Sequence, residues 1–223
     1  MNLAELIQQF RIDAFDLEQP YLFSDDEVTR WLNAAEKEAA IRGRLIHEAV
    51  NPLVCTIEVL PNVSVYPLHE AVYEIEYICL FDAPMPSRAH ELCKTSQEEL
   101  SHRWHDWRTR TGRPDYVIQH DTSIRLSPTP INSGSILLEG YRTPLAPMTL
   151  ETDKPEINTA HHEHLVLWAI HKAFSTPDGE TFDPTKADKA EEAFTAYFGE
   201  RPNSNLRRST REDIPHTVKP FDL

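Results

Sequence analysis

Residues 106–118 of this 223-residue chain read DWRTRTGRPDYVI. Within them, Trp107 marks the expected end of a helix, and Gly112 permits a turn that needs a positive φ. Pro114 then begins a strand at a place where its missing N–H is not required. The segment is therefore predicted to form a rigid corner between a helix and a strand. We assign five residues to this structural corner: Trp107, Arg108, Gly112, Pro114 and Tyr116.

Strands are expected on both sides of the corner. Residues 53–60 are rich in β-branched side chains, and residues 72–79 alternate in polarity. The alternation places four side chains on one face: Tyr73, Ile75, Tyr77 and Cys79. Three further strand segments are separated by proline-rich breaks: 115–119, 123–126 and 136–141. One helix over residues 96–107, opened by a capping box of Ser96 and Glu99, interrupts them. These short strands predict a small antiparallel β-sandwich.

Helices are expected before and after the strands. Residues 1–23 are predicted to be an irregular lead-in with one short helix over residues 3–10. A capping box at Ser24 and Glu27 then predicts a helix to about His47. Residues 165–170 (LVLWAI) are apolar on every side, as in a buried helix. A last helix over residues 187–198 ends at Gly199.

Neither set of helices buries its apolar stripe alone, so the two sets are expected to form one domain that the strands interrupt. The predicted fold is α+β, a small helical bundle with an inserted antiparallel β-sandwich-like module. The bundle is discontinuous, over residues 1–49 and 150–199, and the module with its one helix covers residues 50–149. Residues 200–223 have no periodicity and are predicted to be an extended C-terminal arm.

Composition excludes several classes of function. The net charge of −14 argues against wrapping nucleic acid but allows a channel through which DNA slides. The six glycines form no phosphate-binding loop, and the three cysteines, with no C-x-x-C, are expected to be free thiols. We find no transmembrane stretch and no signal peptide, so no membrane contact is expected. No nucleophile with a base beside it is recognisable, so we predict no catalytic residue and no cofactor.

Histidines are the main candidates for chemistry. His161, His164 and His171 have a spacing that could place three nitrogens on one helical face, as a zinc site requires. The motif is not H-E-x-x-H, and we favour a surface or hydrogen-bonded cluster. A second cluster combines histidines with aromatic rings that could stack on bases: His102, Trp104, His105 and Trp107. Because the tryptophans lie three residues apart, we favour a helix face that enters a core.

The corner segment carries a resemblance to a known family. It is followed by IRLSPTP at residues 124–130 and by GYRTP at residues 140–144. Together these segments resemble tailed-bacteriophage head–tail adaptor (connector) proteins, which carry a β-sandwich insert in a small helical bundle. The resemblance covers about residues 20–200. It implies a structural virion protein that forms a homo-oligomeric ring of twelve copies between the portal protein and the tail or next connector, continuing the DNA channel.

The resemblance also gives the C-terminal arm a role, because such extensions reach into the portal. In this chain the expected portal-binding residues are arginines and apolar anchors: Leu206, Arg207, Arg208, Arg211, Ile214, Val218 and Phe221. The protein is then expected in the neck of the virion, assembled in the host cytoplasm. Two alternatives stay open: a metal-dependent hydrolase that uses the three histidines, and a host module that binds another protein through its arm.

Overall fold

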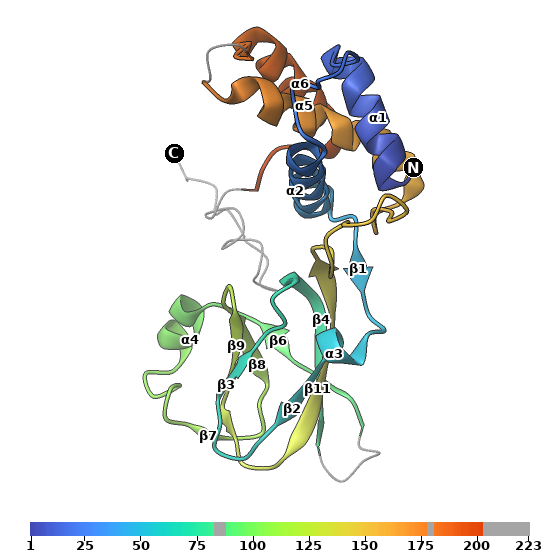
Figure 1. Cartoon of the computed structure of the whole chain (residues 1–223). Coiled ribbons are helices and arrows are strands. Elements are labelled where there is room, and N and C mark those ends of the chain that lie inside the picture. The colour runs from blue at the N-terminus through green and yellow to red at the C-terminus, as the bar shows by residue number, and fades with distance from the viewer. Residues whose placement is uncertain (83–87, 178–180, 203–223) are drawn as a thin grey trace, which may run out of the picture. The chain divides into compact units, whose positions relative to one another are not determined.

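The computed structural model describes residues 1–82, 88–177 and 181–202 (Figure 1). The chain divides into two compact units. Met1–His47 and Arg142–Pro202 form the first, which we call the helical unit. Glu48–Tyr141 form the second, which we call the strand unit. The fold is α+β, as the sequence predicts. No helix in the described parts of the chain is both long and apolar enough to cross a membrane.

The helical unit consists of α1 (Leu3–Ala14), α2 (Asp25–Gly43), a 3-10 turn η1 (Thr159–His164), α5 (Leu165–Ser175) and α6 (Pro184–Phe198). The predicted capping box of Ser24 and Glu27 opens α2. Gly199 ends α6 with φ of 93°, a left-handed value that glycine adopts at little cost. The predicted helix at residues 3–10 begins as expected, where Asn2 and Glu5 form a capping box, but it continues to Ala14 and ends at Phe15, which adopts a left-handed conformation.

One apolar core joins these helices. Phe10 of α1, Leu32 of α2 and Phe194 of α6 are fully buried in it. Trp168 of α5 is 4% exposed, and its ring lies 5.0 Å from the ring of Phe194. Because helices from both ends of the chain share this core, the helical bundle is discontinuous in sequence.

The strand unit holds two principal sheets. The first has the order β1 (His47–Glu48), β11 (Gly134–Arg142), β4 (Val72–Asp82), β5 (His90–Glu91), with β2 (Thr56–Val59) also paired to β11. The second has the order β3 (Val65–Pro67), β9 (Ser123–Ser127), β8 (Tyr116–Gln119), β6 (Cys93–Lys94). Side chains from both sheets, among them Ile78, Leu126 and Leu138, form one core cluster. The unit therefore has the expected sandwich-like packing.

The unit is not purely antiparallel, which corrects the sequence prediction. β6 pairs with β8 in parallel, and β7 (Thr111–Gly112) pairs in parallel with β10 (Thr129–Pro130). A parallel pair needs a crossover of a dozen or more residues. Between β6 and β8 the chain provides one, through helix α4 (Gln97–Arg103) and the corner segment. The sequence prediction of an antiparallel module thus did not include the crossover connection that the corner segment forms.

Two strand predictions need local correction. Residues 52–55 form a short helix, α3 (Pro52–Cys55), because Asn51 caps it and Pro52 occupies its first turn. In β4 the side chains that face the core are at odd-numbered Ile75 and then at even-numbered Ile78. The face of odd-numbered residues that the sequence predicts is therefore interrupted. Lys94 Nζ donates to the successive carbonyls of Ile75 and Glu76, at 3.2 and 3.0 Å. In a regular strand successive carbonyls point in opposite directions, so the strand is irregular here.

Candidate functional site

The structural corner contains a small aromatic core of its own. Trp107 is 2% exposed and packs with Leu100 of α4 and Ile118 of β8. Its Nε1–H donates to Ser101 Oγ at 2.9 Å. Tyr116 is half-buried, and its ring centroid lies 5.4 Å from that of Trp104. The tryptophans therefore enter a core, which supports the structural interpretation of this cluster over base stacking.

Two details of the corner differ from the sequence prediction. α4 ends at Arg103, and Trp107 lies in the turn beyond it, because Trp104 adopts an extended conformation as the C-cap. Gly112 has no positive φ. It pairs with Pro130 in the β7–β10 ladder, and a Cβ placed on it would meet Pro128 at an ordinary 3.7 Å. The corner thus depends on strand pairing rather than on glycine geometry. Pro114 is buried two residues before β8 begins.

Arginines cover the outer side of these aromatic rings. The guanidinium of Arg108 lies 4.3 Å from the Trp107 ring centroid, and that of Arg110 lies 5.2 Å from the Trp104 centroid. Arg103 lies 5.7 Å from the Trp104 centroid, and Arg125 lies 6.0 Å from that of Trp107. We call these four arginines with the two tryptophans the arginine–tryptophan surface. Cation–π contacts of this kind hold a guanidinium in place while its N–H edge stays in water.

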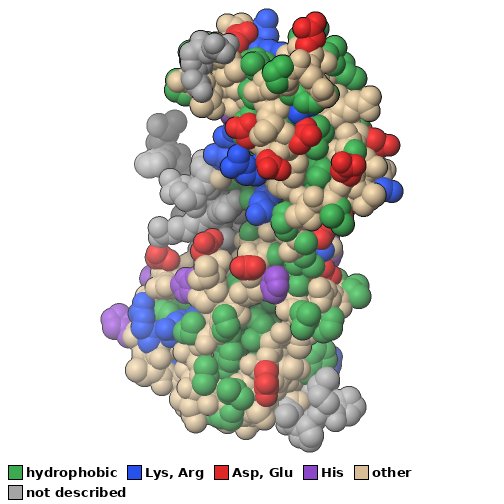
Figure 2. Space-filling view, viewed as in Figure 1, with side chains coloured by type: hydrophobic (Ala, Val, Ile, Leu, Met, Phe, Trp, Pro, Cys, Tyr) green, Lys and Arg blue, Asp and Glu red, His purple; other side chains and the backbone are tan. Residues whose placement is uncertain are grey.

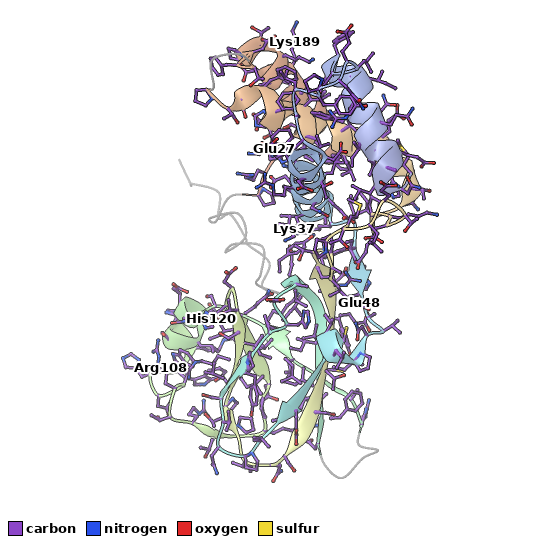
Figure 3. All side chains as sticks on the ribbon, viewed as in Figure 1. Glu27, Lys37, Glu48, Arg108, His120 and Lys189 are labelled. Carbon is purple, nitrogen blue, oxygen red and sulfur yellow. The ribbon has the colours of Figure 1, made fainter. Side chains whose placement is uncertain are left out.

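The four arginines differ in their ion pairs. Arg103 is within 3.2 Å of Glu99, and its Nη1 donates to Tyr116 Oη at 3.1 Å. Arg108 and Arg110 are exposed and have no carboxylate partner in the described parts of the chain. In Figure 2, basic and histidine side chains gather on the flank of the strand unit that carries α4. Figure 3 shows Arg108 on this flank, pointing away from the strands.

An acidic groove lies on the helical unit. It is open and lies along α6 and the residue after its cap, with carboxylates from Asp188, Glu191, Glu192 and Glu200 in its lining. Asp188 and Glu192 are exposed and stand four residues apart on the helix, so they share one face. No basic side chain lines this groove. The four carboxylates give it a negative potential that would attract cationic side chains.

The histidines predicted as metal-ligand candidates contact an aromatic ring or a backbone carbonyl. His161 Nδ1 is 3.1 Å from Tyr197 Oη, and the ring of His164 stacks on Tyr197 at 3.6 Å. His171 Nδ1 donates to the carbonyl of Ala187 at 3.1 Å. The described residues hold no group of three or more His, Cys, Asp or Glu that could bind a metal ion. His162 lies between His161 and His164 in sequence and is 1% exposed, and its ring nitrogens contact the carbonyls of Ile157 and Met1.

One buried carboxylate has a strongly altered acidity. Glu36 of α2 is 1% exposed, and its Oε1 accepts the backbone N–H of Glu156 at 2.6 Å. Burial raises the pKa of Glu36 to about 6, although hydrogen bonds from the backbone of Glu156 and Ile157 act to lower it. The charge of Arg142, which pairs with Glu156, also acts to lower the pKa of Glu36, but its effect is smaller than that of burial.

The residues predicted for portal binding lie outside the described residues: Leu206, Arg207, Arg208, Arg211, Ile214, Val218 and Phe221. The last described ion pair before them joins Arg201 Nε to Glu38 Oε1 at 2.7 Å, on the helical unit. Glu38 has a lowered pKa, because the bonds from Arg201 and Arg42 outweigh its burial.

A protein-family model described as SU10 adaptor protein matches residues 1–216 of the chain. No curated protein matches it. The matched range includes both units and residues 200–216 of the C-terminal arm, which hold the predicted portal-binding residues from Leu206 to Ile214.

Proposed function

The chain belongs to the SU10 adaptor protein family, and we propose that it joins the portal of a tailed bacteriophage to the tail as one subunit of a ring. The observation that carries this proposal is the family match over residues 1–216, which agrees with the resemblance of the corner segment to head–tail adaptors. The role is structural, with no catalysis and no cofactor. The protein would belong to the neck of the virion and be assembled in the host cytoplasm.

In this proposal copies of the chain form a closed ring, of twelve subunits by analogy with head–tail adaptors, docked on the portal protein. The tail or the next connector protein binds the opposite side, and DNA passes through the lumen without sequence-specific contacts. The net charge of −14 supports a lumen to which DNA does not adhere, because phosphate binding needs a dense basic surface. The structural corner would hold α4 and its neighbours at a fixed orientation within each subunit.

The C-terminal arm is the proposed anchor on the portal. Its arginines at 207, 208 and 211 suit bidentate pairing with carboxylates, and its apolar residues suit small pockets. About 20 extended residues reach on the order of 60–70 Å, enough to enter a crevice of a neighbouring ring. Repetition around a ring would convert a weak contact into firm attachment. That the family match extends to residue 216 supports a function for the arginine-bearing part of the arm.

Deletion of residues 204–223 tests the anchor. The full chain and the truncated chain are compared for binding to the assembled portal protein, and we expect the truncated chain to lose most of its affinity. The control is the variant Arg30→Ala, Lys37→Ala, which removes two exposed positive charges from α2 and should bind as the full chain does. Undiminished docking of the truncated chain would refute the anchor, and failure of the full chain to bind any portal would refute the adaptor role.

A further inference from the structure

The arginine–tryptophan surface concentrates positive charge in an acidic unit. Residues 48–141 contain thirteen acidic and seven basic residues, and four of those seven belong to this surface. Arg113, which follows in sequence, is already bound to Asp82 at 2.8 Å. Arg108 and Arg110 are exposed and lack a carboxylate partner in the part of the chain that the structure describes. Two oriented guanidinium groups are thus available to an anionic partner.

Guanidinium groups stacked on tryptophan are well suited to carboxylates. Stacking restricts the long arginine side chain before binding, so less conformational entropy is lost when a partner arrives. The N–H edge of each group can form two parallel hydrogen bonds to one carboxylate. The Trp107 ring beneath Arg108 is itself fixed by its bond to Ser101 and by its burial, so the surface is rigid.

A complementary surface exists on the same chain. The groove of α6 displays Asp188, Glu191, Glu192 and Glu200 without a basic residue in its lining. Asp188 and Glu192 lie one helical turn apart, which allows two guanidinium groups to bind at once. Two different complementary patches on one molecule form a head-to-tail contact between copies, and such contacts close into rings.

We propose that the arginine–tryptophan surface of one copy binds the acidic groove of α6 on a second copy of this chain. The inference rests on the proposed ring-forming function and identifies the contact between neighbouring subunits. Nucleic acid is the less favoured occupant, because the unit around the surface carries six more acidic than basic residues.

The test uses two charge reversals in the full chain. Variant A is Arg108→Glu, Arg110→Glu, and variant B is Asp188→Lys, Glu192→Lys; all four positions are exposed, so folding should be preserved. Self-association is measured by sedimentation over a range of concentrations at low salt, where charge pairs are least screened. We expect the wild-type chain to associate, and each variant to associate about tenfold more weakly or worse.

The decisive experiment mixes variant A with variant B. Every contact in an alternating A–B assembly joins opposite charges, so the mixture should regain the association of the wild type. The matched control is Arg30→Glu, Lys37→Glu, which changes the net charge as much as variant A does from exposed positions on α2 (Lys37 is labelled in Figure 3) and should associate less weakly than A.

Four results would overturn the inference: a monomeric wild type, unaltered association of A or B, no recovery on mixing, or recovery only when all four changes are in one chain. The last would place the contact within a single copy. If A instead loses binding to double-stranded DNA and keeps self-association, the surface binds nucleic acid. Portal binding of the wild type is measured separately. If the wild type binds the portal and variant A associates as strongly as the wild type, only this contact is refuted. If the wild type does not bind the portal, the proposed function is refuted.

Discussion

The buried carboxylate of Glu36 makes the stability of the helical unit depend on pH. Its pKa is raised from 4.5 to about 6 by burial between α2 and the backbone at residues 156–157. A shift of this size corresponds to about 2 kcal/mol, at 1.36 kcal/mol per pKa unit. Because the folded protein holds the proton more tightly than the unfolded chain, this contribution is fully present below pH 4.5. It is lost as pH rises through 6.

Replacing Glu36 by Gln isolates this effect. The amide oxygen can still accept the N–H of Glu156, but the side chain no longer titrates. The free energy of unfolding is measured by urea denaturation for both proteins between pH 4 and pH 8, and the difference between them is plotted against pH. Other carboxylates, including Glu38 with its lowered pKa, contribute equally to both curves and cancel.

We expect the variant to gain about 2 kcal/mol relative to the wild type between pH 4.5 and pH 7, with half of the gain reached about midway between the unfolded pKa of 4.5 and the folded pKa of about 6. Any constant cost of the amide group shifts the whole difference curve without changing its shape. A difference that stays flat over this range would refute the raised pKa. A difference of the opposite sign would mean that the two backbone N–H groups stabilise the carboxylate by more than burial destabilises it.

Two further predictions concern packing. Gly140→Ala in β11 should destabilise the strand unit by several kcal/mol, because a Cβ there collides with the backbone carbonyl of Glu74. The control variant Gly112→Ala should change the free energy of unfolding by less than about 0.5 kcal/mol, because its Cβ meets only an ordinary contact. Equal melting temperatures for the two variants would contradict this prediction. Trp168→Ala should cost about 3–5 kcal/mol, since the ring is 4% exposed between helices from both ends of the chain. An unchanged thermal melt would show that α5 is not central to the bundle, with exposed Phe182→Ala as the control.

Local rules predicted the elements whose signals lie within a few residues. The capping box at Ser24 opens α2 as expected, because a hydroxyl that accepts the third N–H is a strictly local interaction. Ser96 caps α4 in the same way, but the box expected there is not completed, since Glu99 pairs with Arg103. The same rule applied to Asn2 and Glu5 predicts the start of α1. At residues 52–55 the rule for Asn51 and Pro52 prevails over the β-branched composition, because a cap bonds the backbone directly while strand propensity depends on neighbours.

Tertiary contacts account for what the sequence could not supply. The ring of the buried His162 lies 3.0 Å from the backbone carbonyl of Met1, which is 161 residues away and which only the folded chain brings to it. The tryptophans and prolines of the corner segment predict the corner, but the sequence prediction did not group its arginines into one surface. A signal was present, since Arg103 precedes Trp104 and Arg108 follows Trp107 directly. Which of these arginines already have a carboxylate partner is decided by the fold, and this separates Arg108 and Arg110 from Arg103 and Arg113.

The charge distribution bears on when a ring would form. The helical unit carries twenty acidic and eleven basic residues and the strand unit thirteen and seven, so two copies repel each other at a distance. Contact between the arginine–tryptophan surface and the α6 groove is short-ranged and opposes that repulsion only once the copies are adjacent. Free copies would then associate weakly, whereas copies held side by side on a portal would gain each contact at a high effective concentration. Complete rings would in this way form mainly on the portal, while the weaker association of free copies is the quantity that sedimentation measures. Raising the salt concentration would weaken both the repulsion and the contact.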